Sequence, residues 1–285
     1  MTSETRMHSF QTPAPIRLRV EIPAGHIRVV ADDTTETRVE LSARPGDTAA
    51  QALIDDAEIT QAGDAILVRL GKPRLRLLGF GGAVEAVIHA PIGSTATLTT
   101  QSGRIETSGR LGEVHASTAS GAIRLDDSAE ARAHSASGDI DIAGVTGSVV
   151  AKTHSGRITV GQVGGHARIA TASGRAELAG CVGDAKVSTA SGDIEVGEAG
   201  DSLDANAASG SIRIRRTDHG RVRATSLSGQ VSIGVANNAA ARLDISTTSG
   251  RVNSQLESGG PPEPGESRVE LTVSTTSGNV NLRRA

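Results

Sequence analysis

Aromatic residues are almost absent from this chain of 285 residues, which has two phenylalanines, no tryptophan and no tyrosine. Globular cores of this length normally use aromatic rings to fill volume. The interior must therefore be narrow and filled by Val, Ile, Leu, Ala and Thr. Such an interior suits a thin stack of short strands better than a compact globule.

Other scarcities exclude further classes of function. Cys181 is the only cysteine, which excludes a disulfide framework and a cysteine-based zinc site. The formal net charge is −3 and no basic stripe occurs, which argues against nucleic acid as a partner. No stretch approaches the roughly 18 apolar residues of a membrane span, and the polar N-terminus lacks a signal peptide's apolar segment. We therefore expect a cytoplasmic protein without a cofactor, with association with the cell envelope left open.

The chain is rich instead in a Ser-Gly pair that recurs at a nearly constant interval. From Gly103 to Gly229, successive glycines of these pairs lie 17 to 19 residues apart. A fixed short period indicates one turn of a stacked array per repeat, because such a unit cannot bury its own apolar face. The pairs end at Gly103, Gly121, Gly138, Gly156, Gly174, Gly192, Gly210, Gly229, Gly250 and Gly278.

Apolar residues alternate on both sides of each pair. With Gly192 numbered zero, Ala185, Val187 and Thr189 occupy positions −7, −5 and −3, and Ile194 occupies +2. Such alternation predicts strands with one buried face. Side chains of a straight strand alternate strictly, so the change from odd to even buried positions predicts a bend at Ser-Gly. The recurrent threonine at −3 is expected to direct its methyl inward and its hydroxyl along the stack.

These patterns predict an all-β fold, a parallel β-helix (β-solenoid) of about 18 residues per coil. We expect residues 1–13 to form a disordered tail. Residues 14–95 are expected to form degenerate N-terminal coils that cap the stack, with a short helix near 48–57. Residues 96–285 are expected to form the regular solenoid, interrupted by a flexible insertion at 257–267.

Units such as Ala136-Ser137-Gly138-Asp139-Ile140 and Ala190-Ser191-Gly192-Asp193-Ile194 resemble the bacterial β-strand-repeat family labelled "putative adhesin", a family of unknown function. The likeness covers roughly residues 15–285. It implies a right-handed β-helix that is often associated with the cell envelope. It supplies no catalytic residues.

Outward positions carry mixed charges, which predicts a charge-paired surface in which Arg175 lies beneath Asp193. Asp139 and Asp141 are the alternative, a carboxylate site for an enzyme or for calcium. The histidines do not have the spacing of metal ligands. Cys181 occupies a position taken by valine in other repeats, so we expect a buried thiol with a raised pKa.

Two apolar groups are candidates for an interaction surface. Leu77, Leu78 and Phe80 could form an exposed tip, although ordinary packing under the cap is the alternative. Val280 and Leu282 belong to the last repeat, which we expect to end the stack without a cap.

We therefore predict a non-catalytic, adhesin-like binding or scaffold protein whose partner is a protein or a glycan. Two alternatives stay open. One is a homo-oligomer, an end-to-end filament that forms through the solenoid ends. The other is a carbohydrate-active enzyme that uses Asp139 and Asp141.

Overall fold

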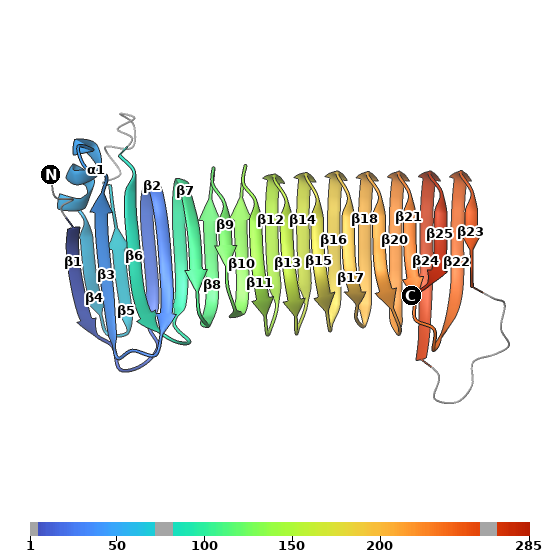
Figure 1. The fold of residues 1–285 in the computed structure, drawn as a ribbon, viewed down its shortest axis with the longest axis horizontal. Coiled ribbons are helices and arrows are strands. Elements are labelled where there is room, and N and C mark those ends of the chain that lie inside the picture. Colours follow the sequence, from blue (N-terminus) through green and yellow to red (C-terminus); the bar gives the residue numbers. More distant parts are fainter. Residues whose placement is uncertain (1–4, 72–81, 257–266) are drawn as a thin grey trace. The chain divides into compact units, whose positions relative to one another are not determined.

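The computed structural model describes residues 5–71, 82–256 and 267–285. Within these ranges the chain is all-β apart from a single short helix (Figure 1). No helix there is long and apolar enough to cross a membrane. The chain divides into two compact units, residues 1–144 (unit 1) and 145–285 (unit 2). Each unit is described by itself.

Unit 1 contains the helix and the antiparallel strands. Its elements are β1 (Thr5–Gln11), β2 (Arg17–Asp32), β3 (Glu36–Ala43), α1 (Thr48–Asp55), β4 (Glu58–Ala62), β5 (Ala65–Arg69), β6 (Val84–Pro91), β7 (Thr95–Ser108), β8 (Leu111–Thr118), β9 (Ile123–Leu125), β10 (Ser128–Ser135) and β11 (Ile140–Val145), which reaches the boundary.

The first part of unit 1 contains both parallel and antiparallel strand pairs. Strand β2 pairs in parallel with β5, β6 and β7, whereas β3 pairs antiparallel with both β6 and β1. Helix α1 begins after Asp47, whose carboxylate accepts a hydrogen bond from the Ala50 N–H at 2.9 Å. The helix buries Ala50 and Ile54. From β7 onwards the described strands of unit 1 pair in parallel, β7 with β8 and β9, β8 with β10, and β9 with β11.

The N-terminal residues correct one sequence expectation. Residues 5–11 form strand β1 rather than part of a disordered tail. They are ordered because β3 offers β1 a complete antiparallel ladder, from Thr5 opposite Ser42 to Gln11 opposite Glu36. The helix expected near 48–57 is α1. The insertion expected at 257–267 lies outside the described residues except for Ser267, which begins a strand.

Unit 2 consists of short strands in regular succession. They are β12 (Val149–Ser155), β13 (Ile158–Val163), β14 (Ala167–Ser173), β15 (Ala176–Cys181), β16 (Asp184–Ser191), β17 (Ile194–Ala199), β18 (Ser202–Ser209), β19 (Ile212–Thr217), β20 (Gly220–Ser228), β21 (Val231–Val235), β22 (Ala239–Ser249), β23 (Val252–Ser254), β24 (Ser267–Ser277) and β25 (Val280–Arg284).

Each repeat contributes one strand to each of two parallel ladders. Strands β12, β14, β16, β18 and β20 pair in that order, and β13, β15, β17, β19 and β21 form the second ladder. The register matches repeat to repeat, since Val187 pairs with Ile169 on one side and Ala205 on the other. All three side chains are fully buried, so the core runs between the two ladders.

The Ser-Gly pairs form the predicted bends. Thr189 and Ile194 are buried, whereas Ala190 and Ser191 between them are both exposed, so the alternation breaks at this point. Glycine is required mainly because the backbones approach closely. A Cβ atom at Gly192 would lie 2.0 Å from the carbonyl oxygen of Gly174 in the neighbouring repeat. Its φ of +150° adds a second, weaker preference for glycine.

The last repeats do not stack in sequence order. Strand β24 pairs in parallel with β20 on one side and with β22 on the other, and β25 lies likewise between β21 and β23 (Figure 1). The final repeat is therefore inserted into the stack. The coil of β22 and β23 ends the described stack, which corrects the expectation that the last repeat would do so.

The connection from β21 to β22 must cross the inserted layer. The Arg284 guanidinium, at the end of β25, donates hydrogen bonds to the carbonyl oxygens of Ala236 at 2.8 Å and Ala239 at 3.0 Å. A cation that bridges two main-chain carbonyls fixes this crossing in place.

Candidate functional site

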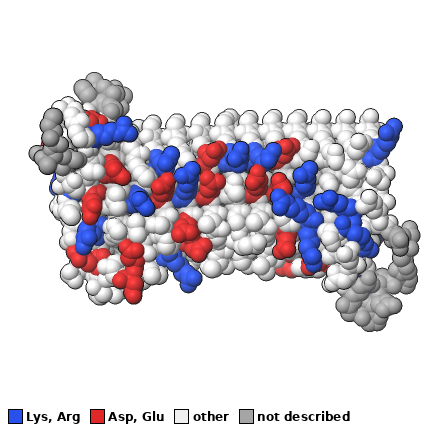
Figure 2. All heavy atoms as spheres, viewed as in Figure 1, with Lys and Arg blue, Asp and Glu red and all other residues white. Residues whose placement is uncertain are grey.

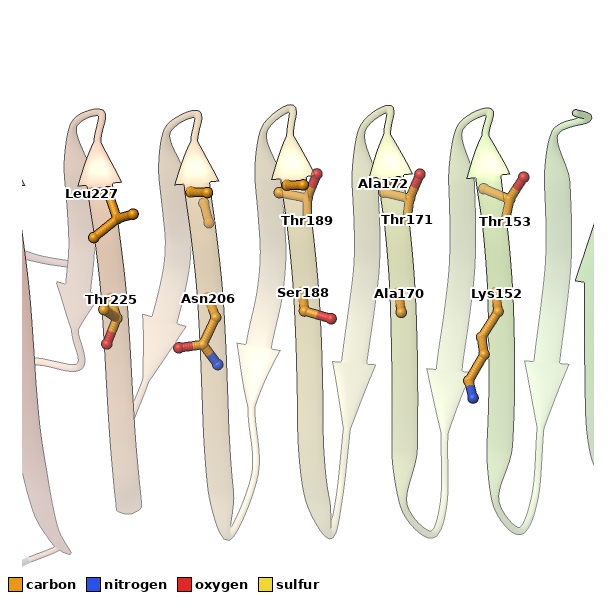
Figure 3. Close-up of a pocket in the computed structure, with 13 residues that line it drawn as sticks. Lys152, Thr153, Ala170, Thr171, Ala172, Ser188, Thr189, Asn206, Thr225 and Leu227 are labelled. Atoms are coloured by element: carbon orange, nitrogen blue, oxygen red, sulfur yellow. The ribbon is translucent and has the colours of Figure 1, made fainter. Parts of the chain in front are cut away.

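A shallow trough runs across the strands β12, β14, β16, β18 and β20 of unit 2. Its volume is about 640 Å³. Figure 3 shows the side chains at the same level of successive strands. The lining residues are Lys152, Thr153, Ala170, Thr171, Ala172, Ser188, Thr189, Ala190, Asn206, Ala207, Ala208, Thr225 and Leu227.

Two outward rows of short side chains make the trough. The first row is in register across the ladder: Lys152 pairs with Ala170, Ala170 with Ser188, Ser188 with Asn206 and Asn206 with Thr225. The second row lies two residues further along each strand and contains Ala172, Ala190, Ala208 and Leu227. Residues two apart on a strand share a face, so both rows face solvent side by side.

The buried residues between the two rows hold the trough floor flat. Thr171 and Thr189 direct their hydroxyls to the carbonyl oxygens of Gly156 at 3.2 Å and Gly174 at 3.3 Å, each in the neighbouring repeat. This confirms that the threonine hydroxyls bond along the stack. At one end Leu227 is 58 % exposed, although it is a large apolar side chain.

Longer charged side chains flank the rows of short ones. On one side Lys186 Nζ lies 3.5 Å from Asp204 Oδ2, and the Asn206 amide donates to Asp204 at 2.8 Å. Beyond the Ser-Gly bends Arg175 lies 3.7 Å from Asp193, as the sequence predicts. These exposed pairs contribute little stability, about 0–1 kcal/mol each. They do give the trough polar margins of mixed sign, and Figure 2 shows such mixing over the face that it displays.

A second hollow, of about 320 Å³, lies elsewhere in unit 2, with Cys181, Glu198, Arg216 and Thr217 among its lining residues. His219 approaches Asp218 at 2.5 Å and Asp201 at 3.6 Å on its rim. Cys181 is 6 % exposed, and its Sγ lies 3.2 Å from the Gly165 carbonyl oxygen. Burial raises the pKa of this thiol, so the group stays protonated and is a poor nucleophile.

The residues predicted from sequence as an interaction surface do not come together in the described structure. Leu77, Leu78 and Phe80 lie outside the described residues. Val280 and Leu282 are 0 % and 1 % exposed, because β25 is covered by β21 on one side and by β23 on the other. They belong to the core, which corrects their assignment to an open end.

At the alternative carboxylate site, Asp141 forms an ion pair, as expected of a charge-paired surface, with its Oδ2 3.7 Å from Arg124 Nε. Asp139 is exposed and two residues away. Among the residues that the structure describes, no three His, Cys, Asp or Glu side chains are placed to hold a metal ion.

Sequence reasoning did not identify the trough. The signal was present in the outward positions, where Ala170, Ala172 and Ala190 replace the long charged side chains that are common on exposed strand faces. Outward alanines are unremarkable one at a time. They become a surface feature only when register places them side by side.

Three solved structures match nearly the whole chain at low sequence identity and low TM-score. One, from Bacteroides fragilis, is named a putative adhesin; it shares 10 % identity and has a TM-score of 0.39, over 99 % of this chain and 97 % of that one. A putative adhesin from Parabacteroides distasonis shares 9 % identity with a TM-score of 0.37, over 98 % and 97 %. A putative lipid binding protein from the same species shares 11 % identity with a TM-score of 0.36, over 98 % and 96 %.

No curated protein matches the chain. The Toastrack DUF4097 family matches residues 107–218 and, in a second overlapping stretch, residues 182–283. These stretches cover more than half of the chain and contain nine of the ten Ser-Gly pairs. The chain is therefore a member of the Toastrack DUF4097 family.

Proposed function

We propose that this chain is a non-catalytic, adhesin-like binding module that holds an extended polymer in the trough of unit 2. The observation that supports this is the repetition of the trough itself. Each of the strands β14, β16, β18 and β20 presents one residue in each outward row, so the same pair of positions recurs about every 4.8 Å. A polymer with a regular repeat can use one such pair after another.

A glycan suits the two rows better than a peptide does. The row of Ala172, Ala190 and Ala208 is apolar, whereas Ser188 and Asn206 in the other row offer a hydroxyl and an amide. A sugar ring likewise has an apolar C–H face and an edge of hydroxyls. A peptide usually binds to a sheet by adding a strand at its edge, whereas the trough lies across the face of paired strands.

We also propose the handedness and the length of the coil that carries the trough. The coil is right-handed, contains about 18 residues, and repeats with parallel strands about 4.8 Å apart. The trough then runs along the stacking direction, and the five strands that line it span roughly 19 Å.

Binding of the full chain to an array of extended glycans tests the proposal. Ala190→Arg places a long charged side chain on the trough floor and should weaken binding at least about tenfold, a loss of ~1.4 kcal/mol. Ala179→Arg is the matched control, since Ala179 is also an exposed strand alanine of unit 2 but lies on β15, outside the trough. It should leave binding unchanged.

A parallel array of extended peptides separates the two classes of partner. Binding to peptides alone would contradict the choice of a glycan. Glycan binding that survives Ala190→Arg would exclude the trough as the site. If the full chain bound neither array, the proposed function itself would be wrong.

A further inference from the structure

The coil of β22 and β23 leaves its interior side chains uncovered. Leu243 is 39 % exposed and Val252 is 48 % exposed. In the adjacent coil, their register partners Leu271 and Val280 are both 0 % exposed. The same interior positions are therefore exposed on β22 and β23 only because no further coil among the described residues lies over them.

Among the described residues, no strand pairs with β22 on this side. In an inner coil the N–H of Val149 donates to the carbonyl of His166 in the next coil at 2.8 Å. Leu243 precedes Gly250 by the same interval as Val149 precedes Gly156, so its N–H and carbonyl face the open side. An exposed strand edge with an apolar interior layer is a template for pairing with another strand.

We propose that this edge binds the same edge of a second copy of the chain. The two β22 strands pair antiparallel about a two-fold axis at Leu243. Leu243 then faces Leu243 of the second copy, and Ala241 faces Ile245. Because Leu243 directs both of its main-chain groups outward, the central pair exchanges two hydrogen bonds. The axis is perpendicular to the sheet, so the exposed interior side chains of the two copies meet in one core.

Charge selects this register. Arg242 and Asp244 are both exposed and lie on either side of Leu243, on the outer face of the sheet. Antiparallel pairing about Leu243 places Arg242 of each copy opposite Asp244 of the other, so the ion pair forms twice. Opposite charges directly across an antiparallel pair are stabilising, and like charges are destabilising. The strand is thus complementary to itself in this orientation.

The edge strands in the described part of unit 1 differ from β22. Strands β1 and β4 each pair on one side only, with β3 and β5, and both pairings are antiparallel. A head-to-tail contact would join β22 to a different edge, whereas the charges of Arg242 and Asp244 make β22 complementary to itself. An isologous contact uses one edge twice and closes as a dimer rather than a filament.

Light scattering coupled to size exclusion tests the dimer on the full chain. The wild type should elute at twice the chain mass at micromolar concentration. Asp244→Arg should raise the dissociation constant at least about tenfold, because Arg242 then opposes an arginine. Arg242→Asp should also raise the dissociation constant, because Asp244 then opposes an aspartate. The double variant R242D/D244R should restore the dimer, and an equimolar mixture of the two single variants should form a heterodimer.

Arg168→Asp is the control, since Arg168 is an exposed outward residue of β14, away from β22. It should not change the mass, and circular dichroism should show that every variant is folded. Leu243→Cys provides an independent readout, because the paired α-carbons would lie about 5.5 Å apart, within reach of a disulfide. A concentration-independent monomer, or a dimer indifferent to both charge reversals, would overturn the proposal.

Discussion

The hydroxyl of Thr189 donates a hydrogen bond to the carbonyl oxygen of Gly174 in the neighbouring repeat, at 3.3 Å. Thr171 and Thr247 make the same bond to Gly156 and Gly278. Each bond joins the end of one strand to the bend of the preceding coil in the stack. Threonine and glycine at these two positions therefore act together. The glycine permits the backbones of adjacent coils to approach closely, and the threonine hydroxyl stabilises this contact with a hydrogen bond.

Thr189→Val keeps the shape of the side chain and removes the hydroxyl. The Gly174 carbonyl then loses its side-chain donor, so we expect a loss of about 1–2 kcal/mol in the free energy of unfolding. Urea unfolding followed by circular dichroism measures it. Thr146→Val is the control, because Thr146 is exposed and should change stability by less than about 0.5 kcal/mol. Equal effects of the two substitutions would contradict a role for the hydroxyl bond.

Gly192→Ala should be far more damaging than its size suggests. The added methyl would lie 2.0 Å from the Gly174 carbonyl oxygen, so the two coils must separate. We expect a loss of about 3 kcal/mol or more. Gly46→Ala separates the cost of this steric clash from the cost of a positive φ. Gly46 has a φ of +87° and no atom within 4 Å of an added Cβ, so the expected cost is ~1–2 kcal/mol. Thermal melting of both variants gives the comparison.

Arg284→Gln removes the cation that bridges the carbonyls of Ala236 and Ala239. We expect faster amide exchange in β22 and β23, by about tenfold, because the crossing segment loses two charge-assisted hydrogen bonds. Mass-spectrometric hydrogen exchange resolves this region. Arg283→Gln, at the exposed neighbouring residue, should leave exchange unchanged. An identical exchange pattern in both variants would show that the bridge is dispensable.

Cys181 should couple stability to alkaline pH. Burial raises the pKa of its thiol above the ordinary value. Its stabilising contribution is thus complete below the pKa of the unfolded thiol, about 8.5, and is lost as the pH rises through the higher folded pKa. Unfolding midpoints of the wild type and Cys181→Ala should converge above pH 9. A thiol reagent at pH 8 should modify the native protein at least about tenfold more slowly than the unfolded chain.

The local structure of a repeat could be predicted from the sequence. Alternation around Gly192 placed Val187 and Ile194 in the core and Ala190 outside, and all three lie there. These predictions succeed because burial on one face imposes a period of two, and a broken period marks a bend. The short helix was predicted from a different local signal, the Ala- and Asp-rich composition of the segment near residues 48–57.

The order of the last coils could not be predicted in this way. Strand β22 has Leu243, Ile245 and Thr247 at its interior positions, and β24 has Leu271, Val273 and Thr275. The two patterns are nearly the same, so either strand fits against β20. Which strand pairs with β20 depends on contacts between distant segments, such as the Arg284 bridge. The periodicity of the sequence does not indicate such contacts. For the same reason Val280 was expected at an open end but is buried.

The exchanged order of the last two coils has a consequence for how the protein is made. During translation, β22 and β23 emerge before β24 exists, when the growing chain offers them only β20 and β21 as a platform. A nascent chain that docks β22 against β20 must release this contact when β24 emerges. In such a chain the coil of β22 and β23 moves outward by one layer, about 4.8 Å, before the native order is complete. The order of synthesis thus differs from the order of stacking, and β24 and β25 are enclosed by strands translated before them.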